Sequence, residues 1–312
     1  MSFRRRPLVV GGMALLTAPS IVFSQSDSVG LANVFLKALR DLGHVEGGDV
    51  VFEWRYADGK VERLSVLAAE LVGLNVDVIV TEGTPGVAAA RRATAATAIV
   101  ATSFADPVSS GFAASLGRPG GNVTGLANLA EETVSKRLEL PLSVAPKVSR
   151  IAWLVNPNNQ AAVRAGALLE AAALRIGKTF VPVEVRAVGD LDDAFARMAR
   201  ERVEALIVAE EATLNSLGAQ IAGLALRQRL PSMFGSRKMP EAGGLMSFGA
   251  AYAVRHRSAA TYVDKILKGA KAGDLPIELP REFELVINLS TAKALGIKIP
   301  NAILLQVTEV IQ

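Results

Sequence analysis

Small polar and charged side chains follow four short apolar runs of this sequence. The runs span residues 76–80, 98–100, 151–155 and 205–208. Hydroxyl, amide and carboxylate groups of this kind bind the charged ends of small solutes through hydrogen bonds and ion pairs. The candidate binding residues that follow the runs are Thr84, Pro85, Ser103, Asp106, Asn156, Asn158 and Glu210.

Thr84 and Pro85 take the cap and first-turn positions of a predicted helix. At such a helix start the amides of Gly86 and Val87 lack partners within the helix, and the helix dipole is positive. A carboxylate would be stabilised there. The alternative is that Thr84 only caps the helix.

Carboxylates in the same segments suit an amino group. Asp106 precedes Pro107, so it either pairs with a ligand amine or only initiates a turn. Either Glu210 or Glu211 could neutralise a ligand ammonium, although a solvated loop is the commoner place for such a charge.

Three further residues are candidates for the lining of a binding cleft. Phe234 and Phe248 offer rings that stack on an apolar or aromatic ligand, and Ser236 offers a hydroxyl. For both phenylalanines, packing in an ordinary core is the alternative.

The elements that position these residues follow from the apolar runs. Runs of this length are typical of strands buried on both faces of a parallel sheet, and stretches of helical periodicity lie between them. Ligands of such sheets bind where the carboxyl ends of strands meet helix amino termini. The repeated pattern predicts an α/β protein with two Rossmann-like lobes, each a parallel sheet flanked by helices, facing one another across a cleft.

The amino terminus is typical of an export signal. Arg4, Arg5 and Arg6 precede an apolar stretch at 7–18, which is too short to span a bilayer. We predict a signal peptide at 1–24, cleaved after Ser24, and a periplasmic location. A weaker cleavage site lies at 18–20.

Gly- and Pro-rich segments at 117–125 and 243–249 predict the places where the chain crosses between the lobes. The predicted lobes are therefore lobe 1 at 25–125 plus 250–277 and lobe 2 at 126–249 plus 278–312.

Composition excludes several classes of site. The chain of 312 residues has no cysteine and two histidines far apart in sequence, so we expect neither a metal nor a cofactor. Net charge is +4, but the basic residues are scattered and aromatic residues make up only 5%, so we expect no nucleic-acid partner.

Several longer motifs resemble a known family, the substrate-binding proteins of ABC transporters of the tryptophan/tyrosine-uptake type. These motifs lie at 43–47, 53–57, 118–125, 241–249 and 283–296. The resemblance covers nearly everything after residue 25. It implies a type 1 periplasmic-binding-protein fold whose lobes, joined by a hinge of several crossings, close on a small solute, first of all an aromatic amino acid. It also implies delivery of that solute to a membrane permease by a protein that is not an enzyme, and we expect a monomer.

One departure from the family concerns the first strand. Members usually carry an apolar strand between the signal peptide and the first helix, but only 26–30 separate Ser24 from that helix here. Either the strand is missing or 20–23 serve as the strand and the leader is cut earlier or not at all. A chain cut after Ser24 would be destabilised, because the first strand of a doubly wound sheet is central.

Two other functions remain as alternatives. A Rossmann-like enzyme acting on a small carboxylate is disfavoured, because the sequence has no cofactor fingerprint and no obvious pair of nucleophile and base. A transcription regulator with the same lobes would need a helix-turn-helix headpiece in place of the export-like leader.

Overall fold

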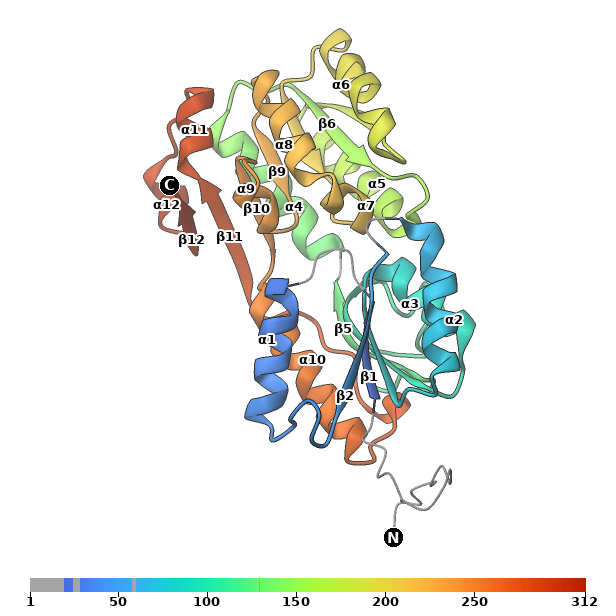
Figure 1. Cartoon of the computed structure of the whole chain (residues 1–312). Coiled ribbons are helices and arrows are strands. Elements are labelled where there is room, and N and C mark those ends of the chain that lie inside the picture. Colours follow the sequence, from blue (N-terminus) through green and yellow to red (C-terminus); the bar gives the residue numbers. More distant parts are fainter. Residues whose placement is uncertain (1–19, 25–28, 58–59, 129) are drawn as a thin grey trace, which may run out of the picture.

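The structure, a computed structural model, describes residues 20–24, 29–57, 60–128 and 130–312. Strands and helices alternate along the chain and form two sheets flanked by helices, one at each end of the molecule (Figure 1). The predicted α/β architecture is confirmed.

The first sheet is parallel throughout and has the strand order β2-β1-β3-β4-β5. Its strands are β1 Ser20–Ser24, β2 Val51–Arg55, β3 Val78–Glu82, β4 Ala98–Ala105 and β5 Val123–Asn128. The main helices beside it are α1 Val29–Asp41, α2 Leu64–Gly73, α3 Gly83–Ala93 and α10 Tyr252–Leu267. This sheet and its helices are called lobe 1 below.

Both faces of the first sheet are covered, which explains why its strands are apolar runs. Val80 packs with Phe35 of α1 and Val263 of α10, whereas Ile79 packs with Leu71 of α2. Figure 1 shows α1 and α10 on one side of this sheet and α2 and α3 on the other. Neighbouring residues of a strand point to opposite faces, so a strand covered on both sides must be apolar at successive positions.

The second sheet has the order β12-β11-β10-β9-β8-β6-β7, and only the β10–β11 pair is antiparallel. Its strands are β6 Arg150–Val155, β7 Thr179–Glu184, β8 Ala205–Val208, β9 Ser232–Phe234, β10 Met246–Ala250, β11 Phe283–Asn288 and β12 Glu309–Ile311. The helices of this part, called lobe 2 below, are α4 Ala130–Val144, α5 Gln160–Arg175, α6 Leu191–Arg200, α7 Ala212–Ser216, α8 Gly218–Arg227, α9 Lys238–Glu241, α11 Leu289–Leu295 and α12 Asn301–Leu304.

Residues 20–24 supply the first strand of lobe 1. β1 lies between β2 and β3, and Ile21 is in register with Phe52 on one side and Val78 on the other. A lobe 1 that starts at residue 25, after a signal peptide at 1–24, would lack this interior strand, so the sheet agrees with the alternative in which 20–23 serve as the strand. The rest of the predicted leader, 1–19, lies outside the described residues.

The chain passes between the lobes after β5, after β10 and before β11. Leu126 of β5 bridges Glu278, so the chain still lies beside lobe 1 shortly before it enters β11. The Gly-rich segments at 117–125 and 243–249 lead into strands β5 and β10, and each crossing follows the strand.

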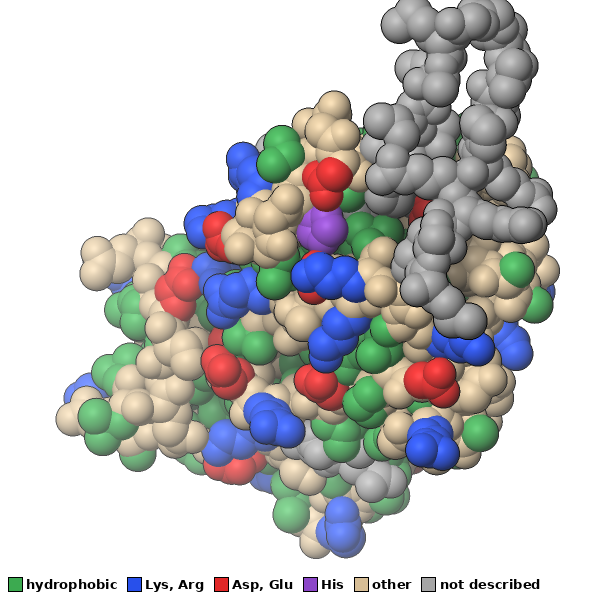
Figure 2. Space-filling model, turned by 90° about the horizontal axis from the view of Figure 1, so that it is seen from below, with side chains coloured by type: hydrophobic (Ala, Val, Ile, Leu, Met, Phe, Trp, Pro, Cys, Tyr) green, Lys and Arg blue, Asp and Glu red, His purple; other side chains and the backbone are tan. Residues whose placement is uncertain are grey.

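Charges of both signs are interspersed on the face of the molecule shown in Figure 2. In the described part of the chain, no helix has the length and apolar character needed to cross a membrane.

Candidate functional site

A cavity of about 160 Å³ lies between the lobes. The ends of β3, β4 and β5 line it from lobe 1, and the end of β8 and the start of α5 line it from lobe 2. Drug-sized ligands fill cavities of roughly 300–1,000 Å³, so this cavity suits a smaller solute.

The wall from lobe 1 combines polar groups with apolar side chains, among them Val61, Leu64 and Phe104. Thr84 Oγ1 accepts a hydrogen bond from the Ala105 amide at 3.0 Å, so this hydroxyl ties the start of α3 to the end of β4. Asn128 Nδ2 donates to Ser103 Oγ at 3.0 Å. No side chain caps α3, whose first turn, including Pro85, lies on the cavity wall. This wall therefore offers hydroxyl, amide and backbone groups to a ligand.

The wall from lobe 2 has an apolar surface beside its polar and charged groups. The apolar surface is formed by Trp153 of β6, Ile207 of β8 and, from α5, Ala161, Ala162, Ala165 and Leu169. Gly166 lets the indole of Trp153 lie close to α5, because a Cβ atom at Gly166 would come within 2.6 Å of Trp153 Nε1. Asn159 caps α5 by accepting a hydrogen bond from the Ala162 amide at 3.3 Å.

Charged groups from both lobes meet at the cavity. Arg137 Nη2 of α4 lies 2.6 Å from Glu210 Oε2, and Arg137 Nε donates to the Phe248 carbonyl at 2.8 Å. Arg255 Nη1 lies 3.6 Å from Glu210 Oε1 and 3.8 Å from Glu82 Oε1. Glu82 belongs to lobe 1 and Glu210 to lobe 2, so one arginine faces a carboxylate of each lobe.

Burial raises the pKa of two carboxyl groups at the cavity. Burial raises the pKa of Glu82, although the charge of Arg255 opposes the shift. Burial also raises the pKa of Glu211, against hydrogen bonds that its carboxylate accepts from the amides of Leu214 and Thr213. Glu211 thereby caps α7, so its carboxylate is already engaged within lobe 2.

Four of the candidate residues from the sequence line the cavity: Thr84, Pro85, Ser103 and Glu210. Asp106 and Asn158 do not line it. Asp106 Oδ2 instead lies 3.5 Å from Arg164 Nη2 of α5, which joins the two lobes beside the cavity. The backbone amide of Asn158 donates a hydrogen bond to Asn156 Oδ1 within a loop.

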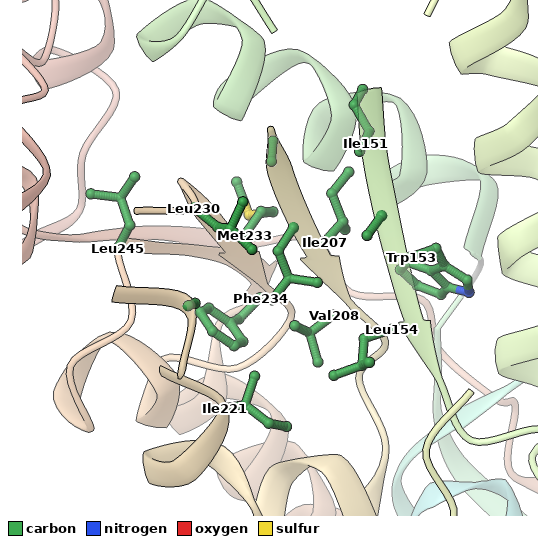
Figure 3. Close-up of a cluster of buried hydrophobic side chains, with 14 of the residues drawn as sticks. Ile151, Trp153, Leu154, Ile207, Val208, Ile221, Leu230, Met233, Phe234 and Leu245 are labelled. Carbon is green, nitrogen blue, oxygen red and sulfur yellow. The ribbon is translucent and has the colours of Figure 1, made fainter. Parts of the chain in front are cut away.

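Asn156, Phe234 and Ser236 also lie away from the cavity wall. Asn156 is buried and donates to Thr213 Oγ1 at 3.3 Å, a contact that holds two loops of lobe 2 together. Phe234 lies in the core of lobe 2, where Figure 3 shows it with Val208 and Ile221. Its strand places the ring inside the sheet packing, so the ring is not available to stack on a ligand.

The prediction omitted several residues of the cavity: Glu82, Asn128, Arg137, Trp153 and Asn159. Glu82 and Asn128 end strands β3 and β5, so the rule that strand ends form the site could have found them. Arg137 lies in helix α4, and no motif in the sequence around it indicates a binding role. Trp153 lies inside an apolar run that reads only as core.

Within the described residues, no group of three or more His, Cys, Asp or Glu side chains is arranged to hold a metal ion.

Comparisons with known proteins agree with this architecture. A tyrosine-binding protein of Clostridioides difficile is 25% identical over 264 residues, which cover 85% of this chain and 76% of that protein. The crystal structure of a conserved domain protein from Vibrio cholerae has a TM-score of 0.87 at 29% identity, covering 94% of this chain and all of that one. An ABC domain from Streptococcus pneumoniae in complex with L-Trp has a TM-score of 0.85 at 23% identity, covering 95% of this chain and all of that one.

These likenesses show the two-lobed fold of type 1 periplasmic binding proteins, as the sequence motifs predicted. The family model for ABC transporter substrate binding proteins matches residues 22–311, nearly the whole chain. The chain therefore belongs to the family of ABC transporter substrate-binding proteins.

Proposed function

We propose that this protein captures an amino acid, first of all an aromatic one, in the cavity between its lobes and delivers it to an ABC permease. The observation that carries the proposal is that carboxylates of both lobes and an uncapped helix start share one cavity with apolar side chains such as Trp153. An amino acid likewise combines charged backbone groups with a side chain, which is largely apolar in the aromatic amino acids.

The charged ends of such a solute find partners of the right sign. Glu82 and Glu210 line the cavity and suit an ammonium group. The first turn of α3, with Gly83 and Thr84 on the cavity wall, suits a carboxylate, because the amides at a helix start lack partners within the helix. The apolar side chain would then lie against Trp153 and α5.

The names of the relatives support the choice of amino acid. One relative is a tyrosine-binding protein, and one similar structure contains L-Trp. Substrate-binding proteins work by binding and release, so we propose no chemical conversion of the solute. We further propose that the protein is exported, acts outside the cytoplasm and is a monomer that meets its permease through the surfaces of both lobes.

The test is thermal unfolding against a panel of the amino acids, aromatic acids and small carboxylates. A solute that binds only the folded state raises the midpoint by mass action, here by about 5 °C at a hundredfold excess over its Kd. We expect the shift for L-tyrosine, L-tryptophan or L-phenylalanine. A shift for a different solute would replace the cargo, and no shift for any amino acid would contradict the proposal.

A second prediction concerns the apolar surface of the wall from lobe 2. Ala165→Leu adds bulk where α5 lines the cavity, so we expect the affinity for the bound amino acid to fall by about tenfold or more. Ala171→Leu is the matched control, because Ala171 is an exposed residue of the same helix that does not line the cavity. Isothermal titration calorimetry compares the two variants. Equal affinities for both would place the ligand elsewhere.

A further inference from the structure

Arg255 lies buried behind the cavity, where it faces both lobes. Its side chain is 5% exposed, and it does not contribute to the cavity wall. Its Nη1 lies 3.6 Å from Glu210 Oε1 and 3.8 Å from Glu82 Oε1, and both of these glutamates line the cavity. One buried cation is therefore shared by two carboxylates that reach the ligand space from opposite lobes.

Arg255 acts on these carboxylates through its charge more than through fixed hydrogen bonds. Among the described residues, its Nε and Nη1 atoms are buried and have no hydrogen-bond partner. An isolated buried charge is costly, so the two carboxylates are what makes its burial tolerable. In return, the charge of Arg255 lowers the pKa of Glu82, against the effect of burial.

Other charged groups surround this arrangement. Arg137 of α4 holds the second oxygen of Glu210 at 2.6 Å. The charges of Glu284 on β11 and Lys238 on α9 also act on the cluster, and the Tyr252 ring lies 5.6 Å from the Arg255 guanidinium carbon. His256, the next residue along α10, is buried. Arg255 thus faces Glu82 and Glu210 together, whereas Arg137 pairs with Glu210.

We propose that Arg255 is a positioning residue for solute binding, holding Glu82 and Glu210 as charged carboxylates that face the amino group of one bound solute. This inference rests on the proposed function, because it assumes a solute with an amino group. The two carboxylates converge on the amine only when both lobes contribute to the cavity. Lobe closure would therefore complete the site for the amino group.

The test measures the pH dependence of affinity by calorimetry between pH 5 and 9. The probes are L-tyrosine and 3-(4-hydroxyphenyl)propanoate, which lacks the amino group. Without Arg255 the carboxyl group of Glu82 loses a neighbouring positive charge that lowers its pKa, so that pKa rises further and Glu82 binds a proton at higher pH. For Arg255→Gln we expect the midpoint of the fall in L-tyrosine affinity with falling pH to move up by about one unit or more.

The expected pattern separates charge from general damage. At pH 7, Arg255→Gln should weaken L-tyrosine by about tenfold or more and leave the analogue without the amine much less affected. Arg255→Lys should restore the pH midpoint of the wild type, because it restores the charge. Arg257→Gln, which removes an exposed arginine from the same helix, should match the wild type throughout.

Two results would overturn the inference in different ways. If the wild type binds L-tyrosine but Arg255→Gln weakens both probes equally at every pH, Arg255 has only a structural role and the proposed function stands. If the wild type binds no amino acid, the proposed function fails together with this inference. Should Arg255→Gln not fold, the double variant Glu82→Gln/Arg255→Gln removes both charges and leaves Glu210 paired with Arg137. It should again weaken L-tyrosine by about tenfold or more and the analogue without the amine much less, and equal weakening of both probes would overturn the inference.

Discussion

A chain that begins at Gln25 is expected to lose the cooperative folding of lobe 1, whereas a chain that begins at Ser20 retains it. The difference is strand β1, Ser20–Ser24, which pairs with β2 along its whole length and with β3 from Ile21 to Ser24. Without it, β2 has no neighbour in the sheet and β3 loses one of its two.

The expected effect is larger than the stability of an ordinary domain. Backbone N–H and C=O groups on facing edges of two strands would lose their partners, and buried groups of this kind are almost always paired. Each such loss costs roughly 1–3 kcal/mol, against a total stability of about 5–15 kcal/mol.

Thermal unfolding followed by circular dichroism, together with limited proteolysis, checks this prediction. We expect the chain from Gln25 to show a broad or missing transition and early cleavage within lobe 1, and the chain from Ser20 to melt cooperatively. Identical melting of the two chains would mean that β1 contributes nothing to the fold.

The substitution Gly125→Ala is expected to destabilise the protein by about 4 kcal/mol or more. Gly125 has φ +123° and lies in β5 directly opposite Ala101 of β4. An added Cβ atom would lie 2.1 Å from the Ala101 carbonyl oxygen and 2.7 Å from its nitrogen. Because both are backbone atoms within a sheet, neither can move aside as a flexible side chain would, and the positive φ adds strain.

Gly117→Ala is the matched control for this substitution. Gly117 precedes the same strand, but an added Cβ atom there would meet no atom within 4 Å, and its φ is not in the left-handed region. Chemical denaturation of both variants measures the free energies of unfolding. A change of less than about 0.5 kcal/mol for Gly125→Ala would show that β4 and β5 can separate at little cost.

Much of the fold could be predicted because each strand is covered on both faces. The run at 205–208 coincides with β8, and the run at 151–155 differs from β6 by one residue. Strand β5 was missed, since Gly125 and its neighbours read as a chain break. Gly125 allows β5 to lie close to β4. The sequence around Gly125 does not indicate that β4 is its neighbour in the sheet.

The amino-acid sequence alone determined the two lobes, the family and the edge of each sheet where the site lies. These follow from the periodicity of apolar residues and from short motifs. Which polar residues reach the cavity depended instead on the tertiary structure. Asn156 turns inward to Thr213, while Arg137 and Arg255 come to the site from helices distant in the chain. Their roles depend on the packing of the two lobes around one space, and that packing is set by contacts between residues far apart in sequence.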